Sequence, residues 1–455
     1  MRQAFRGIVF HLLDDPDLGA EAAVVYEDGA LLIEDGHIAE AGTWADIQLL
    51  VKGAPVERFP NSILVPGFID SHVHFPQVDM VASPGHHLLH WLSAYAFPAE
   101  SRFHHEEVAA ETARFFLDQL LANGTTTALV FATAHKVSAE ALFAESYRRN
   151  LRLITGKVLM DVGAPAGISD TAETGYMESR ALIREWHGKG RLGYAVTPRF
   201  ALTSSERQLE LAGRLLADHP GVKLHTHLAE NLDEIEAVHR MFPDCGDYFG
   251  VYEKFGLATP HSVFAHCLHL TPAEWVRMGT AGSNIAFCPT SNLFLGSGLF
   301  NLAAAETAGV RVGLGTDVGA GTSLSLLATM NEAYKVCQLQ QRNVSAFKLF
   351  YLATLGAARA LRLDDKIGNF APGKEADFLV LDARSLPLLS RRWDHATTIA
   401  EKLFALAILG DARAVARTYV AGKCAHERDK PQLSSPASLR TGSAKVREED
   451  PSLDD

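Results

Sequence analysis

Short runs of aliphatic and β-branched residues alternate with amphipathic stretches from about residue 63 to about residue 360. This alternation is typical of βα units, in which each strand is followed by a helix that packs against the sheet. The runs that predict strands lie at residues 64–74, 125–132, 153–161, 193–200, 222–230, 262–270, 283–289 and 310–317. Eight strands spread over roughly 300 residues predict an α/β protein whose core is a (β/α)8 TIM barrel.

Two of the segments between the strands carry clear helix signals. From residue 106 to residue 123, apolar side chains recur near helical spacing, acidic residues occupy the first turn, and Asn123-Gly124 provides a stop. Ser205 followed by Gln208 is a capping-box pattern that predicts the start of a helix running to about residue 219. Each predicted helix begins after the C-terminal end of a strand, so the helices show where those strand ends lie. Barrels of this class place their active sites at the C-terminal strand ends.

Strand-like pieces also flank the predicted barrel. They lie at residues 6–11 and 29–38 before it, and at residues 377–381 and 415–420 after it. The chain has 455 residues, more than a barrel needs, so we expect both flanks to form one small β-sandwich-like domain. The predicted organisation is residues 1–65 for the N-terminal part of the small domain, 66–366 for the barrel, 367–429 for the C-terminal part of the small domain, and 430–455 for a disordered tail rich in Ser, Pro and charge.

Charge and hydropathy limit the partners of the chain. The 42 Lys and Arg residues against 54 Asp and Glu give a formal net charge of -12, whereas a nucleic-acid-binding protein needs a basic face. No apolar run approaches about 18 residues, and the first residues lack the apolar core of a signal peptide. We therefore expect no nucleic-acid partner, no membrane segment and a cytoplasmic protein. The five scattered cysteines predict reduced thiols, with packing as the preferred role of Cys267 and Cys288.

Five polar fragments close or follow the predicted strands. They are His72-Val73-His74, His227-Leu228-Ala229-Glu230, Ala265-His266-Cys267, Cys288-Pro289-Thr290-Ser291-Asn292 and Gly315-Thr316-Asp317. Because the C-terminal ends of barrel strands meet at one rim, these fragments can bring histidines and two carboxylates together. A hydrolytic metal needs a few neutral imidazoles or carboxylates and a position left open for water. The joint pattern therefore predicts a metal-dependent hydrolase.

Spacing indicates a role for each group. His72 and His74 are two residues apart, so on a strand they point to the same side and can reach one ion. Asp317 can ligate the ion and hydrogen-bond its water, and Glu230 is close enough to act as a general acid/base without binding the metal. Each group has an ordinary alternative when taken singly. An isolated HxH in a chain with 20 histidines is more often surface or core, and an Asp after a glycine is usually a turn or a helix cap.

One stretch resembles the first strand of the amidohydrolase superfamily of metal-dependent hydrolases: Val65-Pro66-Gly67-Phe68-Ile69-Asp70-Ser71-His72-Val73-His74. Further stretches are similar to the guanine deaminases of that superfamily: Phe75-Pro76-Gln77, Thr197-Pro198-Arg199-Phe200, and residues 225–230, 288–300 and 315–321. The resemblance extends to residues 372–377 and covers most of the chain except the tail.

The resemblance implies a homodimeric enzyme of purine catabolism that hydrolyses guanine to xanthine and ammonia. It implies one Zn2+ per subunit, held by His72, His74, His227 and Asp317, with His266 near the water or the substrate. Metal-bound hydroxide would attack C2 of guanine, and Glu230 would take a proton from the metal-bound water and pass it to the purine ring. The implied catalytic residues are Glu230, His266 and Asp317.

Guanine recognition also has a physical argument. Gln77 offers both an amide donor and a carbonyl acceptor, whereas Arg199 offers only donors. Guanine presents the acceptor O6 beside the donor N1–H, while adenine would present an amine to Arg199. A site whose polar group is left unpaired can reject such an analogue by roughly 10^4-fold. Phe200 could stack on the ring or simply pack at a strand end, and the whole predicted substrate-binding set is Gln77, Arg199, Phe200, His74, His227, Glu230 and Asp317.

Two alternatives stay open. One is a related amidohydrolase acting on another heterocycle, such as a triazine, a pterin or an adenosine derivative, and the other is a non-catalytic protein that keeps the fold as an interaction module. The sequence lacks the other zinc deaminase signature, H-x-E with P-C-x-x-C, and it lacks H-E-x-x-H and the glycine-rich phosphate motifs. Strand four has no obvious bridging lysine, which favours one metal over two. Zinc suits the imidazole-rich set, although iron or manganese can occupy similar sites.

Overall fold

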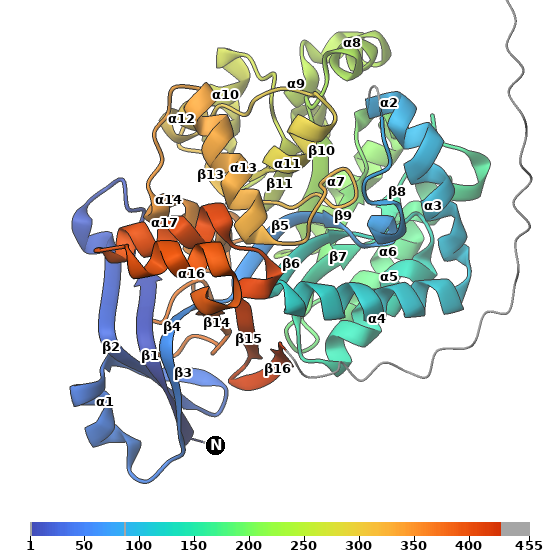
Figure 1. Cartoon of the computed structure of the whole chain (residues 1–455). Coiled ribbons are helices and arrows are strands. Elements are labelled where there is room, and N and C mark those ends of the chain that lie inside the picture. The colour runs from blue at the N-terminus through green and yellow to red at the C-terminus, as the bar shows by residue number, and fades with distance from the viewer. Residues whose placement is uncertain (1, 86–87, 429–455) are drawn as a thin grey trace, which may run out of the picture.

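Eight parallel strands form the nearly closed barrel that the sequence predicts (Figure 1). A computed structural model of the chain describes residues 2–85 and 88–428, and the predicted tail at residues 430–455 lies outside the described residues. The barrel strands are β5 (Phe68–His74), β6 (Thr125–Phe131), β7 (Arg152–Gly156), β9 (Gly193–Pro198), β10 (Lys223–Leu228), β11 (Ser262–His266), β12 (Asn284–Phe287) and β13 (Arg311–Leu314), with the short β8 (Val158–Leu159) paired to β9. All eight predicted strands are confirmed.

Hydrogen bonds join β5 to the segment that follows β13, the last strand of the barrel. The Asp317 amide donates to the His72 carbonyl across a distance of 2.8 Å. The carboxylate of Asp70 adds two bonds across the same seam, because it accepts from the backbone amide (3.0 Å) and the hydroxyl (2.5 Å) of Thr316. The seam therefore fixes two of the predicted site residues, His72 and Asp317, relative to each other.

Apolar side chains of the barrel strands point alternately into the barrel and outward against the helices. Ile69, Leu129 and Ile154 share one interior cluster. Phe68 and Val130, their neighbours along the strands, belong instead to the larger cluster that includes the surrounding helices. Successive side chains of a strand point to opposite faces, so the same strands supply both layers and hold the rim rigidly.

Helices follow the barrel strands in order (Figure 1). They are α4 (Glu106–Ala122), α5 (Lys136–Arg148), α6 (Ala172–Trp186), α7 (Glu206–Asp218), α8 (Leu232–Met241), α9 (Tyr248–Lys254), α10 (Pro272–Ala281), α11 (Pro289–Phe294), α12 (Leu302–Thr307), α13 (Leu326–Leu339), α14 (Ala346–Ala353) and α15 (Leu355–Ala360). α4 ends at Asn123, and Gly124 has a positive φ of 83°, as the Asn-Gly stop predicts. Ser205 caps α7, but the predicted box is only half formed, because the Gln208 side chain donates to Asp170 instead (3.0 Å). Among the described residues, no helix combines the length and the apolar character needed to cross a membrane.

Both ends of the chain contribute to the small domain, as the flanking pieces predict. Its strands are β1 (Arg2–Leu12), β2 (Ala23–Glu34), β3 (His37–Thr43), β4 (Val56–Pro66), β14 (Phe378–Asp382), β15 (Val415–Val420) and β16 (Lys423–Glu427), with α1 (Trp44–Val51) beside β2 and β3. They form one sheet in the order β16-β15-β14-β4-β1-β2-β3. The small β domain that we expected from both ends of the chain is confirmed, and it consists of one seven-stranded sheet. The barrel covers one of its faces, since Ile63, Val65 and Leu381 lie in the large core cluster with barrel helices. Beyond β14, α17 (Ile399–Leu409) packs beside α13 and α14, and α16 (Pro387–Asp394) packs on α17.

The first barrel strand begins later than predicted. Residues 64–66 belong to β4, which pairs with β1 and β14 of the small sheet. Gly67 separates β4 from β5, and any side chain there would collide with Thr126. Ion pairs from Arg152 and Arg191 of the barrel to Glu375, near the start of β14, then tie the small domain to the barrel.

A helical insertion between β5 and α4 packs on the strand ends. It contains a 3₁₀ helix (Phe75–Met80), α2 (Leu88–Trp91), a π-helical turn (Leu92–Ala96), α3 (Phe97–Ser101) and a second 3₁₀ helix (Arg102–His104). Its apolar residues share a cluster with Phe131, at the end of β6, and Phe200, just beyond β9; they are Met80, Leu88, Trp91, Leu92, Ala96 and Phe97. The insertion therefore forms a wall beside the C-terminal rim of the barrel.

Candidate active site

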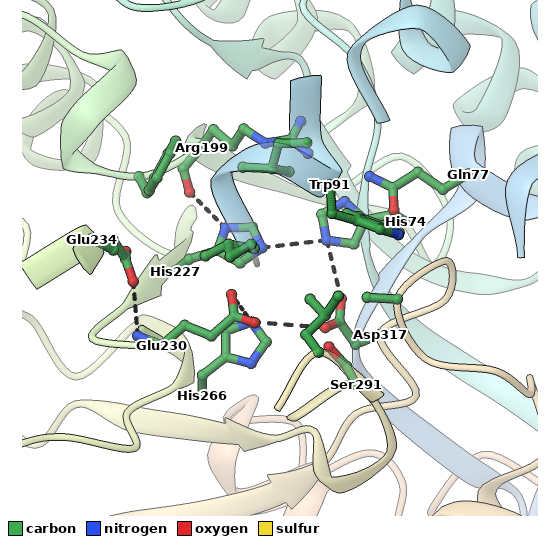
Figure 2. Close-up of a pocket in the computed structure, with 15 residues that line it drawn as sticks. His74, Gln77, Trp91, Arg199, His227, Glu230, Glu234, His266, Ser291 and Asp317 are labelled. Atoms are coloured by element: carbon green, nitrogen blue, oxygen red, sulfur yellow. Dashed lines mark hydrogen bonds and ion pairs between the residues drawn. The ribbon is translucent and has the colours of Figure 1, made fainter. Parts of the chain in front are cut away.

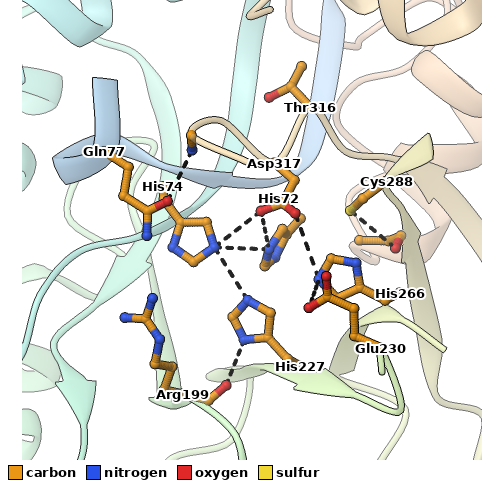
Figure 3. A network of polar contacts seen from close by, with 12 residues as sticks. His72, His74, Gln77, Arg199, His227, Glu230, His266, Cys288, Thr316 and Asp317 are labelled. Atoms are coloured by element: carbon orange, nitrogen blue, oxygen red, sulfur yellow. Dashed lines mark hydrogen bonds and ion pairs between the residues drawn. The ribbon is translucent and has the colours of Figure 1, made fainter. Parts of the chain in front are cut away.

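The predicted site residues meet at the C-terminal rim of the barrel (Figures 2 and 3): His72, labelled in Figure 3, and His74 lie on β5, His227 and Glu230 at and beyond the end of β10, His266 on β11, and Asp317 beyond β13. The backbone has a left-handed conformation at Ala229, His266, Cys267 and Asp317, with φ values of 49°, 72°, 54° and 51°. Such a conformation costs a non-glycine residue roughly 1–3 kcal/mol, and it persists where the surrounding fold enforces it. The strained positions all lie at strand ends that carry the site.

Three histidine nitrogens and one carboxylate oxygen crowd around a single point (Figure 3). The Nε2 of His74 lies 3.2 Å from the Nε2 of His72 and 3.3 Å from the Nε2 of His227. The Oδ1 of Asp317 lies 3.0 Å from the Nε2 of His72 and 3.3 Å from that of His74. Three imidazole nitrogens cannot all satisfy one another by hydrogen bonds, whereas one cation can accept a lone pair from each of them.

His266 also reaches this centre. Donor atoms of His72, His227, His266 and Asp317 all lie within 4.8 Å of one another. The Nδ1 of His266 is held 2.8 Å from the Oδ1 of Asn292. Its Nε2 is buried and has no hydrogen-bond partner among the described residues. His266 is therefore available either to the ion or to a ligand beside it.

The surroundings keep the histidines neutral and Asp317 ionised. Burial lowers the pKa of His74 to about 3, and it lowers the pKa of His72 and His227 as well. The Nδ1 of His227 donates to the carbonyl of Arg199 (2.7 Å), which leaves its Nε2 with a lone pair for the centre. Burial alone would raise the pKa of Asp317, but His72 and His74 hold that pKa well below its ordinary value. Neutral imidazoles with one carboxylate are the donor set of a catalytic zinc site, so these residues fit such an ion.

Two supporting residues were missed by sequence reasoning. The Nε2 of His225 lies 2.7 Å from the Nδ1 of His72, and the Asp70 carboxylate accepts from the His72 amide (3.2 Å). Both side chains are fully buried. His225 lies two residues before His227, and Asp70 lies two residues before His72. This spacing could have identified both residues, because residues i and i+2 share one face of a strand and metal-binding histidines need partners that orient them.

Glu230 lies beside the centre and has a strongly raised pKa. Its Oε2 is 3.4 Å from the Nε2 of His266, and its Oε1 accepts from the Ser297 hydroxyl (3.2 Å). Burial raises the pKa of Glu230 to about 8, and the negative charge of Asp317 adds to the rise. The carboxyl therefore holds its proton near neutral pH in the metal-free protein, which suits a group that exchanges protons with a substrate.

A pocket opens beside these groups (Figure 2). Its polar lining consists of His74, Gln77, Arg199, His227, Glu230, Glu234, His266, Ser291 and Asp317, and its apolar lining of Leu88, Trp91, Leu92, Phe200, Leu295 and Ala320. A small pocket with apolar walls and a few convergent polar groups suits a flat heterocycle. Phe200 lies in the wall, and it shares an apolar cluster with Trp91, which no motif in the sequence indicated.

Gln77 and Arg199 share a buried partner that sequence reasoning also missed. The Gln77 side-chain nitrogen donates to Glu100 (2.8 Å), and the Nη1 of Arg199 donates to both Glu100 oxygens (2.9 and 2.7 Å). Glu100 lies on α3 and is 0% exposed. A buried arginine needs a counter-charge, and that requirement was the signal that could have prompted a search for an acidic partner.

Known proteins resemble this chain over most of its length. The chain matches the Amidohydrolase family over residues 63–425. It is 49% identical over 422 residues to the guanine deaminase of Escherichia coli (strain K12), covering 92% of this chain and 96% of that protein. It is 40% identical over 433 residues to a probable guanine deaminase of Deinococcus radiodurans, covering 93% and 99%. Among solved structures, the guanine deaminase from C. acetobutylicum with guanine bound in its active site matches with a TM-score of 0.86 at 28% identity, covering 93% of this chain and all of that one.

Proposed function

Because the chain belongs to the amidohydrolase family, we propose that it acts as a guanine deaminase, which hydrolyses guanine to xanthine and ammonia. One observation carries the proposal: the Nε2 atoms of His72 and His227 lie 3.2 Å and 3.3 Å from the Nε2 of His74, so all three nitrogens face one point. That point adjoins a pocket lined by the proton-holding Glu230 and by Arg199. A binding module would need neither the strained strand ends nor a buried carboxyl with a raised pKa.

We propose that His72, His74, His227 and Asp317 hold one Zn2+ per subunit. The neutral nitrogens and the single carboxylate match the ligands that zinc takes in hydrolases. Zinc bound there would act as a Lewis acid and make a water molecule nucleophilic at neutral pH. The Nε2 of His266, which has no hydrogen-bond partner among the described residues, would hydrogen-bond that water or the substrate.

Glu230 moves the protons in this proposal. Its carboxyl lies in the pocket lining, within reach of both His266 and Ser297. In its ionised form it accepts a proton from the attacking water, and it then delivers that proton to the purine ring as the oxygen adds to C2. A further proton transfer to the 2-amino group lets it leave as ammonia, so guanine and water become xanthine and ammonia. General acid/base catalysis of this kind contributes roughly 10^2 to 10^4-fold in rate.

Arg199 and Gln77 select the ring in this proposal. Arg199 carries only donors and would face O6, while Gln77 carries one donor group and one acceptor for the polar edge of guanine. Adenine would set an amine against the Arg199 donors and leave both sides unpaired. Phe200 and Trp91 supply apolar walls for the faces of the ring. A homodimer stays a prediction from the resemblance, and a cytoplasmic location stays a prediction from the hydropathy of the sequence.

The test is ammonia release from guanine, with adenine, cytosine and a triazine in parallel, on zinc-loaded and chelator-treated protein. We expect metal-dependent xanthine formation from guanine alone. Metal-dependent release from a different ring would keep the chemistry and overturn the roles of Arg199 and Gln77. No release from any ring would overturn the enzymatic proposal in favour of a non-catalytic interaction protein.

A further inference from the structure

Glu100 connects three distant segments of the chain behind the pocket. It lies on α3 and accepts from Gln77, in the 3₁₀ helix after β5, and from Arg199, just beyond β9. Gln77 and Arg199 both line the pocket, whereas Glu100 lies outside its lining. Any influence of Glu100 on a ligand must therefore pass through these two side chains.

Glu100 determines which way the Gln77 amide points. A carboxylate can only accept hydrogen bonds, so the nitrogen of the amide must face Glu100. The backbone amide of Gly319 can only donate, and it donates to the Gln77 oxygen (3.1 Å). A reversed amide would place a donor against Gly319 and an acceptor against Glu100. The remaining N–H and lone pair of Gln77 thus have fixed directions.

Glu100 also orients and neutralises Arg199. The Nη1 group contacts both Glu100 oxygens, which leaves the N–H groups of Nε and Nη2 for a ligand. The guanidinium carbon lies 5.3 Å from the centre of the Phe97 ring, so α3 holds it from a second direction. Arg199 is 2% exposed, and a buried charge without a counter-ion would be costly. The pair has no net charge, which suits recognition of a neutral ring.

We propose that Glu100 is the positioning residue for purine recognition, because it fixes Arg199 and Gln77 in the geometry that reads the O6 and N1–H edge. The proposal rests on the proposed guanine deaminase function. Glu100 touches no substrate in this arrangement, so its loss acts by displacing the two side chains that do. A displacement of about 1 Å in a binding group can lower the rate on the order of 100-fold.

The test compares E100Q, which keeps the shape and removes the charge, with E100D, which keeps the charge and shortens the side chain. Catalytic efficiency, kcat/KM, for guanine is measured on zinc-loaded protein whose folding is checked by thermal unfolding. E100Q should lower kcat/KM on the order of 100-fold, because its amide turns N–H groups toward other donors, and E100D should lose less. If Glu100 only fills space, E100Q will resemble the wild type and E100D will be the weaker enzyme, and that order overturns the proposal.

A double-mutant comparison separates positioning from stability. In an R199A background, E100Q should cause much less further loss of kcat/KM than it causes alone, because the main group it positions is gone. Losses that multiply would overturn the proposal. The matched control is E375Q, because Glu375 is a partly buried carboxylate that pairs with two arginines, neither of which lines the pocket. It should lower the unfolding temperature and leave kcat/KM unchanged.

Two further readouts cover the remaining outcomes. If E100Q does not fold, the inhibition constant of hypoxanthine is measured for E100D, because hypoxanthine keeps O6 and N1–H and lacks the 2-amino group. It should weaken in E100D and stay unchanged in E375Q, and an unchanged value in both overturns the proposal. Ammonia release from guanine by the wild type tests the proposed function and does not involve the variants. If the wild type converts a different ring, the kcat/KM values of the same variants are compared on that ring, and this comparison still decides the role of Glu100.

Discussion

Replacing Glu230 with Gln should lower turnover and raise stability at the same time. The side chain is 4% exposed, and its oxygens lie next to His266 and Ser297. Glutamine keeps the size and can still accept from Ser297, but it cannot exchange a proton. The loss of general acid/base catalysis should lower kcat by roughly 10^2 to 10^4-fold, which is about 3–5 kcal/mol of activation free energy. Zinc content should not change, because Glu230 is outside the proposed ligand set.

The gain in stability follows from the raised pKa of Glu230. In the metal-free protein, burial and the charge of Asp317 raise this pKa from the ordinary 4.5 to about 8. The folded state therefore keeps the proton to higher pH than the unfolded state does, so stability falls as the pH rises above about 4.5 and the full cost is present above about 8. At about 1.4 kcal/mol per pH unit, that cost is on the order of 5 kcal/mol. Glutamine removes it, because its side chain never ionises.

Urea unfolding of chelator-treated wild type and E230Q at about pH 5 and about pH 9 measures this effect. The two proteins should have nearly the same unfolding free energy at the lower pH, and E230Q should be more stable by several kcal/mol at the higher pH. Equal free energies at both pH values would refute the raised pKa. Undiminished turnover of zinc-loaded E230Q would refute its role in proton transfer.

Three more perturbations test the site and the seam of the barrel. Arg199→Ala should lower kcat/KM for guanine far more than any residual adenine activity, since only guanine offers O6 to the lost donors; equal losses would mean that Arg199 is structural. Chelation should abolish ammonia release and lower the unfolding temperature, because a ligand that binds the folded state stabilises it. Added zinc should restore both the activity and the unfolding temperature. Activity in protein that contains no metal by metal analysis would contradict the proposed zinc site. Thr316→Val should lower the unfolding free energy in urea by about 1–3 kcal/mol, because the buried Asp70 carboxylate loses its hydroxyl partner. An unchanged free energy would show that this bond adds nothing to the seam.

The barrel and the rim of the site could be predicted from the sequence because both depend on short-range order. Each strand is a run of apolar residues, and the polar residue that ends the run takes its place at the rim from the strand itself. His72, His227, His266 and Asp317 were predicted in this way, and the structure places their donor atoms within 4.8 Å of one another. The two-residue spacing that put His72 and His74 on one side of β5 is likewise a local property.

Contacts between distant segments were decided only by the tertiary structure. Glu100 lies 23 residues from Gln77 and 99 residues from Arg199, and only the packing of α3 on the strand ends brings the three together. Residues 64–66 join the small sheet because β4 pairs with β1 and β14, which come from the two ends of the chain. The raised pKa of Glu230 depends on the exclusion of water by the whole pocket. Residue type and short-range spacing therefore determined which chemical groups reach the rim, whereas long-range packing determined their orientation and protonation, because burial and partner choice are properties of the folded chain.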